Sequence, residues 1–178
     1  MDFTYKNYSK KGYLQYLANK YGDFKVTKSV KQEDGSVTWW KHYSVLELSQ
    51  TEKGMWILDQ VTHRTSLSCE IILDMDDDIS MDKVEMISNY LKKFSVPHAV
   101  FFTGSRGYHI HVFLREVAKS NNIISWREKI RGMLINKFNC DPLKSSDKMM
   151  IALEFCNHWK SGKQKSPIIQ FPEKWWFL

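Results

Sequence analysis

Cysteine is scarce in this sequence, and its few copies lie far apart. The 178 residues include three cysteines, Cys69, Cys140 and Cys156, and no two of them form a Cys-x-x-Cys pair. An odd number of widely separated cysteines argues against a disulfide framework and against a structural zinc site. We therefore expect a reducing, intracellular location, in the cytoplasm or nucleoid.

Long apolar runs, targeting segments and repeats are also missing. No stretch has the length and hydrophobicity of a membrane span, and the N-terminus has no signal-peptide or transit-peptide pattern. The chain contains no internal repeat, no low-complexity segment and no linker rich in Pro, Gly and Ser. These absences predict a soluble protein without a membrane partner.

The composition is that of a folded, mildly basic protein. Hydrophobic residues make up 43% of the chain and aromatic residues 14%, enough to bury a core, so disorder is not expected. The net charge of +6 favours a polyanionic partner, although many soluble proteins reach this value. Acidic residues nevertheless crowd one segment, which indicates a metal site facing a polyanion: Glu70, Asp74, Asp76, Asp77, Asp78, Asp82 and Glu85.

The acidic segment begins as an apolar strand over residues 69–76. Side chains alternate along a strand, so Asp74 and Asp76 point to the same side. Two carboxylates so close repel each other unless one is protonated or a cation lies between them. Mg²⁺ and Mn²⁺ take such oxygen ligands and leave positions open for phosphates and water. Asp77 and Asp78 are interpreted instead as a solvated strand end or a helix cap.

A second stretch, residues 101–113, predicts a strand, a tight turn and another strand. Glycines at both ends of the turn 104–107 permit positive φ and close approach of a ligand, so backbone N–H groups can bind an anion. Ser105 and Arg106 add donors for phosphate oxygens. His109 and His111 share one side of the second strand, and His109 is the better phosphate or metal contact because it lies nearer the turn. The alternative is a hairpin that merely has a basic tip.

Other expected elements follow from periodicity and capping signals. We expect helices over residues 7–21, 80–94 and 125–138, the last opened by a capping box at Ser125. Strands are expected over residues 25–31, 37–43, 54–58 and 99–102, with a polar connector at 63–65, a strand or short helix at 149–155 and a basic turn at 157–163. The helix over residues 125–138 is predicted to bury Ile130, Met133, Leu134 and Phe138 and to turn Arg127 outward or toward a partner.

The order of these elements predicts an α+β protein. A strand, a helix, two strands, a helix and a final strand are the order of an RRM-like split βαβ sheet, with the acidic strand beside the histidine hairpin. Residues 1–65 are predicted to form a small N-terminal α/β module packed on a core of residues 66–178, together making one compact domain.

The motifs taken together resemble those of the archaeo-eukaryotic primase superfamily. Residues 73–76 are similar to its first motif, and residues 103–109 to its second, in which a Ser/Gly/Arg-rich turn precedes a nucleotide-binding histidine. Asp141 and residues 155–163 resemble its third motif, and the latter segment looks particularly like the catalytic small subunit of heterodimeric primases. The resemblance covers residues from about 65 to about 170 and implies the fold of a primase catalytic core.

That resemblance implies a DNA primase or primase-polymerase, which makes or extends short primers on single-stranded DNA by two-metal nucleotidyl transfer from NTPs or dNTPs. Asp74, Asp76 and Asp141 would bind two Mg²⁺ or Mn²⁺ ions. The implied nucleotide-binding residues are Ser105, Arg106, Gly107, His109, His158, Lys160 and Lys163. The implied partners are the DNA template and, as further candidates, a large primase subunit, a helicase or another replication or repair protein.

The sequence departs from the family pattern at Ala152. Family members usually carry Lys or Arg six residues before the last histidine, so either Lys148, Lys160 or Lys163 substitutes here or triphosphate binding is weaker. The cysteine-rich zinc element of many relatives is also missing, as are helicase and iron–sulfur modules. The resemblance therefore implies a minimal catalytic core.

Three alternatives remain open from the sequence. The two histidines flanked by apolar residues also fit the HUH motif of replication initiator endonucleases, but no tyrosine follows His111 to act as nucleophile. A catalytically degenerate primase fold that only binds nucleic acid is the second alternative, supported by Ala152. The third is a polymerase domain of end-joining repair, which shares the same motifs.

Overall fold

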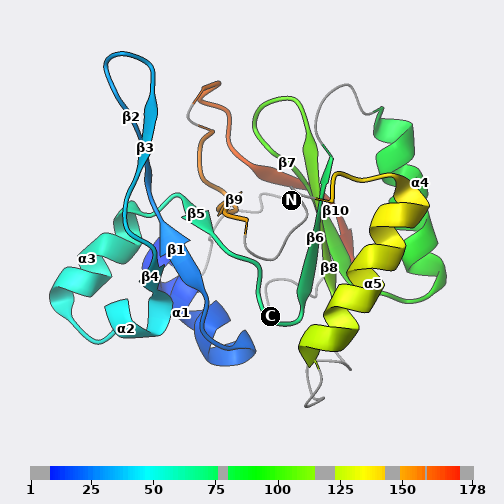
Figure 1. The fold of residues 1–178 in the computed structure, drawn as a ribbon, viewed down its shortest axis with the longest axis horizontal. Helices are drawn as coiled ribbons and strands as arrows, with labels where there is room; N and C mark the ends of the chain where they lie inside the picture. Colours follow the sequence, from blue (N-terminus) through cyan, green and yellow to red (C-terminus); the bar gives the residue numbers. More distant parts are fainter. Residues whose placement is uncertain (1–8, 76–79, 115–122, 143–148, 159, 173–178) are drawn as a thin grey trace.

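The computed structural model describes residues 9–75, 80–114, 123–142, 149–158 and 160–172. They form helices and antiparallel sheets, with the N-terminal elements beside a second sheet that carries two long helices (Figure 1). Within these ranges no helix is both long and apolar enough to cross a membrane.

The N-terminal part mixes short strands and helices. Its elements are α1 (Lys10–Tyr21), β1 (Lys25–Thr27), β2 (Ser29–Lys31), β3 (Val37–Trp39), β4 (Tyr43–Ser44), α2 (Val45–Leu48), α3 (Glu52–Gln60) and β5 (His63–Arg64). Gly22 ends α1 with a φ of 91°, and a turn at Asp34 and Gly35 closes the β2–β3 hairpin. This hairpin projects from the body of the protein (Figure 1).

The remaining elements build the larger sheet and its helices. They are β6 (Glu70–Met75), α4 (Met81–Lys93), β7 (His98–Phe102), β8 (Tyr108–Phe113), α5 (Ile123–Phe138), β9 (Ile151–Ala152) and β10 (Ser166–Phe171). The larger sheet has the strand order β10-β7-β8-β6 and is antiparallel throughout. The acidic strand β6 and the histidine strand β8 are neighbours, as the sequence predicted.

The strand order departs from an RRM-like sheet at one edge. Strand β8 lies between β6 and β7, which is the split βαβ arrangement. The last strand, β10, pairs with β7, whereas an RRM-like sheet would place it against the first strand of the unit, here β6. Among the described strands, β6 is therefore an edge strand.

Each side of the larger sheet has its own apolar core. Ile71, Leu73 and Met75 of β6 pack with apolar residues of α4 and α5. On the other side, Phe101 and Phe113 pack with residues of α1 and with the segment around β9. A second four-stranded sheet, built of shorter strands in the order β4-β1-β5-β9, contains residues from both sides of position 65, because β5 pairs with β9. The division into residues 1–65 and 66–178 stays a prediction.

Several sequence-based predictions were wrong in detail. Residues 54–58 are helical, because Thr51 caps α3 through the Gly54 N–H and Gly54 packs directly on the backbone of Leu48. The helix α5 begins at Ile123, so Ser125 is not its cap. Met133 is 67% exposed, although it was expected in the core.

Three further corrections concern Phe94, residues 63–65 and Arg127. Phe94, the last residue of the helix expected over residues 80–94, lies just after the end of α4 and is 58% exposed. Residues 63–65 were expected to be a polar connector, yet β5 is the central link between β1 and β9. Arg127 was expected to face outward or toward a partner, but it is buried and donates to the carbonyl of Leu67.

Candidate active site

The predicted carboxylate and histidine lie side by side at one end of the larger sheet. In the β6–β8 register Asp74 is directly opposite His109, and Met75 is opposite Tyr108. The Asp74 Oδ1 atom lies 3.6 Å from His109 Nε2, and their side chains are 15% and 9% exposed. The turn between β7 and β8 therefore lies beside the end of β6, where the acidic run begins.

The two basic turns of the sequence pack on each other at this end of the sheet. The first turn, residues 103–107, joins β7 to β8, and the second is the tip of a hairpin in which His158 N–H donates to the Lys163 carbonyl. A Cβ atom at Gly104 would lie 2.5 Å from Lys163 O and 2.9 Å from His158 Cβ. Ser161 Oγ also donates to the Gly104 carbonyl. Gly104 thus serves a close approach of two backbones, with a φ of 87°.

His109 is held as a neutral imidazole. Burial, together with the positive charges of Lys165 and Arg64, lowers the pKa of His109 well below its ordinary value. Its Nδ1 atom is buried and has no hydrogen-bond partner among the described residues. A buried polar atom without a partner is costly, so this atom is suited to meet a group that the chain itself does not supply.

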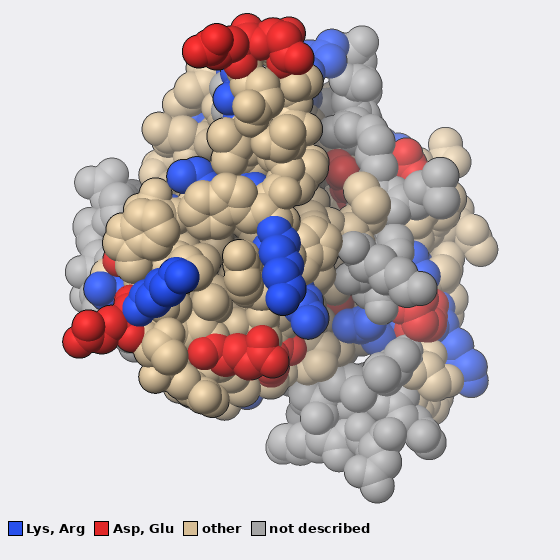
Figure 2. Space-filling view, turned by 60° about the vertical axis from the view of Figure 1, so that its left-hand side comes forward, with Lys and Arg blue, Asp and Glu red and all other residues tan. Residues whose placement is uncertain are grey.

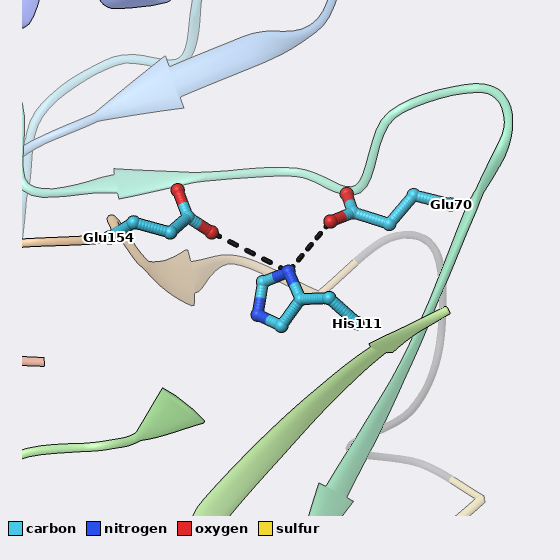
Figure 3. Close-up of side chains that lie close together, drawn as sticks. All are labelled: Glu70, His111 and Glu154. Carbon is cyan, nitrogen blue, oxygen red and sulfur yellow. Dashed lines mark hydrogen bonds and ion pairs between the residues drawn. The ribbon is translucent and has the colours of Figure 1, made fainter. Parts of the chain in front are cut away.

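A fully buried ionic network lies next to these residues on the same side of the sheet. Arg64 from β5 donates two hydrogen bonds to Glu70, of 2.7 and 2.9 Å, and two to Glu154, of 2.7 and 3.0 Å. His111 contacts Glu70 through its Nδ1 atom at 2.7 Å, and Figure 3 shows the imidazole between the two carboxylates. The network links β5, β6, β8 and the segment after β9.

The carboxylates of this network are ionised because Arg64 lies between them. Burial alone would raise the pKa of Glu70, but Arg64 and His111 hold it well below its usual range. Burial opposes ionisation of Glu154 as well, yet Arg64 and Lys165 lower its pKa to about 2. Paired, hydrogen-bonded charges of this kind are tolerated in a protein interior only while every partner is present.

Glu70, His111 and Glu154 also form a possible metal-binding group. Each offers one ligand atom, and these atoms all lie within 4.8 Å of one another. The Arg64 guanidinium, however, already supplies the positive charge and donates to both carboxylates. A cation bound there would have to displace Arg64, so we interpret the group as a structural ion pair.

Lys165 brings a buried positive charge next to Ala152. Its Nζ atom is 2.8 Å from the carbonyl oxygen of Ala152, the residue that departs from the family pattern, and 3.2 Å from His111 Nε2. Burial is the main cause that lowers the pKa of Lys165 to about 8, and the carboxylates of Glu154, Glu70 and Asp74 act in the opposite direction.

His63 extends the site toward the N-terminal sheet. Burial and then the charges of Lys165 and His158 lower the pKa of His63 to about 4, so the ring is neutral near pH 7. When His63 is protonated, its charge further lowers the pKa of His109. His63, His109, His158 and Lys165 therefore lie around one region, although they come from four separate segments.

The structure brings together some of the predicted site residues but not all of them. Asp76 lies outside the described residues. Asp141 is exposed and follows Cys140, a thiol whose pKa is raised first by burial and also by the nearby Asp74 carboxylate. The remaining residues line the two turns, with Gly107 buried, Ser105 and His158 half-buried, and Arg106, Lys160 and Lys163 exposed.

Sequence reasoning missed four residues of this region: His63, Arg64, Glu154 and Lys165. Arg64 was placed in a polar connector, and Glu154 and Lys165 flank the predicted basic turn on its two sides. A charged residue inside an apolar stretch, such as Glu154 between Leu153 and Phe155, is the signal that could have found one of them.

The contacts of His111 do not support the alternative that His109 and His111 form an HUH metal site. Its Nδ1 atom contacts Glu70 and its Nε2 atom contacts Lys165. His109 and His111 could therefore ligate one metal ion only if both contacts of His111 were rearranged.

Comparison with known proteins connects this chain to primases through structure alone. No profile of a known protein family matches the sequence, and a search of curated proteins found no match. Among solved structures, the chain is similar to the catalytic domain of primase RepB' in complex with initiator DNA. The TM-score is 0.51 at 15% identity, covering 92% of this chain and 86% of that one.

Two further structures are similar. A crystal structure of primase RepB' aligns with a TM-score of 0.52 at 13% identity, covering 88% of this chain; the alignment spans 55% of the RepB' chain. The polymerase domain of Mycobacterium tuberculosis Ligase D in complex with DNA aligns with a TM-score of 0.42 at 12% identity, covering 80% and 62% of the two chains. The two RepB' alignments show that the chain has the fold of a primase catalytic domain.

Proposed function

We propose that this protein is a DNA primase or primase-polymerase, which makes or extends short primers on single-stranded DNA by template-directed nucleotidyl transfer. The observation that carries the proposal is the meeting of Asp74, His109 and the two basic turns at one end of a sheet with a primase fold. These segments are far apart in sequence. Their proximity in the fold is what a site that binds both a carboxylate-held cation and a triphosphate would require.

The chemistry of the donor set fits divalent cations. Asp74 offers carboxylate oxygens beside the end of β6, and we propose that Asp76 and Asp141 complete the ligand set for two Mg²⁺ or Mn²⁺ ions. Such ions, when bound, would activate the attacking 3′-hydroxyl and stabilise charge on the transferred phosphoryl group and the departing pyrophosphate.

The remaining residues would hold and orient the nucleotide. We assign triphosphate binding to Ser105, Arg106, Gly107, His109, His158, Lys160 and Lys163. Neutral His109 can donate one hydrogen bond to a phosphate oxygen without adding charge, while the exposed Arg106, Lys160 and Lys163 attract the polyanion. Lys165 adds a positive charge close to both Asp74 and His109, and its Nζ atom donates to the carbonyl of Ala152, the position at which family members usually carry Lys or Arg.

The first test is synthesis by the purified protein. With a single-stranded DNA template, NTPs or dNTPs and Mg²⁺ or Mn²⁺, we expect short products on a denaturing gel. Excess chelator should abolish the products, because the carboxylates would then have no ions to present to the substrate. Added cation should restore them. A protein that binds the template but makes no product under any of these conditions would be a degenerate primase fold instead.

His109→Ala should chiefly weaken nucleotide binding. Loss of one hydrogen bond to a charged phosphate costs about 1.5–3 kcal/mol, which predicts a rise of about ten- to a hundredfold in the apparent KM for nucleotide with a smaller change in kcat. His109→Gln, which keeps a donor, should recover part of the loss. His42→Ala, at an exposed histidine between β3 and β4, is the matched control and should leave KM unchanged. A fall in kcat alone would contradict the assigned role.

A further inference from the structure

One exposed tryptophan stands at the edge of the candidate active site. Trp39, the last residue of β3, is 50% exposed, and its ring contacts the His63 ring edge-on with the centroids 4.7 Å apart. His63 in turn pairs with Ala152 in the β5–β9 register, and the Ala152 carbonyl accepts a hydrogen bond from Lys165. Trp39 is therefore the outermost member of a series of side chains that leads into the site.

Backbone pairing and hydrogen bonds at the root of the β2–β3 hairpin, the end opposite its tip, fix the position of Trp39 in addition to the contact between its ring and His63. Trp39 pairs with Ser29 in the β2–β3 register. The N–H of the next residue, Trp40, donates to the Lys28 carbonyl, and the Trp40 carbonyl accepts a hydrogen bond from Thr27 Oγ1. Ser29 N–H donates to Thr62 Oγ1, and that hydroxyl contacts His63 Nδ1 at 2.9 Å. The indole is thus held beside His63 before any ligand binds, which lowers the entropic cost of using it.

The two other exposed tryptophans among the described residues lack this placement. Trp56 is 60% exposed on α3, and Trp126 is 51% exposed on α5, the helix that covers the opposite side of the larger sheet. Isolated exposed aromatic residues are ordinary features of protein surfaces. The contact with a ring of the candidate site distinguishes Trp39 from both.

Charge on the hairpin indicates where a polyanion would lie. In the β2–β3 register the exposed Lys31 shares a face with Trp39, because alternate residues of both strands point the same way. The tip of the hairpin instead carries the exposed Glu33 and Asp34. Acidic side chains gather at the top of the molecule as it is viewed in Figure 2. A nucleic-acid strand would be repelled from the tip and favoured near the root, where Trp39 lies.

We infer that Trp39 is a stacking platform for a nucleobase at the entrance of the active site, a role that rests on the proposed function. An indole that is fixed in place, half-exposed and on the same face of the hairpin as Lys31 suits a base of single-stranded DNA or of the incoming nucleotide. Stacking of a base on an aromatic side chain is tolerant of sequence, because every base has a π-face.

The test compares oligothymidylate with an abasic strand of equal length, so that the phosphate charge is the same. Dissociation constants would be measured by fluorescence anisotropy at one fixed salt concentration, without nucleotide or divalent ions. Trp39→Ala should weaken oligothymidylate binding about tenfold and leave abasic binding unchanged. Trp39→Phe should bind nearly as tightly as the wild type, and the matched control Trp56→Ala should show no loss.

A second arm separates the two possible sources of the base. If Trp39 stacks on the incoming nucleotide, Trp39→Ala leaves oligothymidylate binding unchanged but raises the apparent KM for nucleotide about tenfold in primer extension. Equal losses on both strands, or no change in either arm, would overturn the stacking role. Because the DNA arm needs no synthesis, a base-dependent loss without catalysis would reject the proposed function alone.

Discussion

Asp74→Asn should abolish primer synthesis while leaving the fold intact. The substitution keeps the size and shape of the side chain but removes the charge that we propose binds the cations at the end of β6. Loss of about 4 kcal/mol of transition-state stabilisation corresponds to a fall in rate of about a thousandfold, which is the least we expect. Product formation on a primed and an unprimed template would measure it.

The control for this substitution is an aspartate of another region. Asp59 on α3 pairs with Lys11, and both side chains are 39% exposed, so Asp59→Asn should change activity and stability little. Asp74→Asn should retain the wild-type circular dichroism and unfold within about 1 kcal/mol of the wild type. We expect the same loss of activity for Asp76→Asn. Normal synthesis by both active-site variants would refute the assignment of the carboxylates.

Arg64→Met should be among the most destabilising single substitutions in the protein. Arg64 is fully buried and neutralises Glu70 and Glu154, so its removal leaves two buried carboxylates without their main partner. Breaking a buried ion pair in this way typically costs about 3–5 kcal/mol in the free energy of unfolding. Chemical denaturation at pH 7 would measure the loss directly.

A surface arginine provides the comparison. Arg131 on α5 pairs with Glu128 one turn away, in a partly exposed position, so Arg131→Met should cost at most about 1 kcal/mol. Arg64→Lys should keep the charge but lose the planar fork that reaches both carboxylates, and should fall between the wild type and Arg64→Met. A loss for Arg64→Met no larger than that for Arg131→Met would show that the network contributes little.

The pH dependence of the Arg64→Met effect has a defined sign. In the wild type, Arg64 depresses the pKa of both carboxyl groups, that of Glu154 to about 2, so their contribution to stability is lost only as the pH falls toward that range. Without Arg64, burial should raise both pKa values above those of the unfolded chain. The variant should therefore gain stability relative to the wild type as the pH falls from neutral toward 5.

The local features of the site could be predicted from the sequence because they depend on near neighbours in the chain. The apolar run with alternating acidic residues predicted β6, and two glycines bracketing Ser105 and Arg106 predicted the turn before β8. Period-two alternation placed His109 and His111 on one side of a strand. The structure added that His109 is directly opposite Asp74.

Prediction from the sequence failed where a short apolar stretch is compatible with more than one secondary structure. Residues 54–58 fit a strand as well as a helix, and the choice was made by the Thr51 cap and by the close packing of Gly54 on α2. The burial of Arg127 was likewise decided by the carbonyl groups that it meets in a distant segment.

The sequence by itself determined which strands carry the acidic and histidine residues and which turns are basic. Only the tertiary structure decided which of these segments meet, since Arg64 and Glu154 pair across 90 positions of the chain and Lys165 lies beside the Ala152 carbonyl across a hairpin. Periodicity and capping act over a few residues, whereas burial of charge is settled by partners that the fold brings from elsewhere. The charged interior around His109 is therefore a property of the folded protein and could not be read from any one motif.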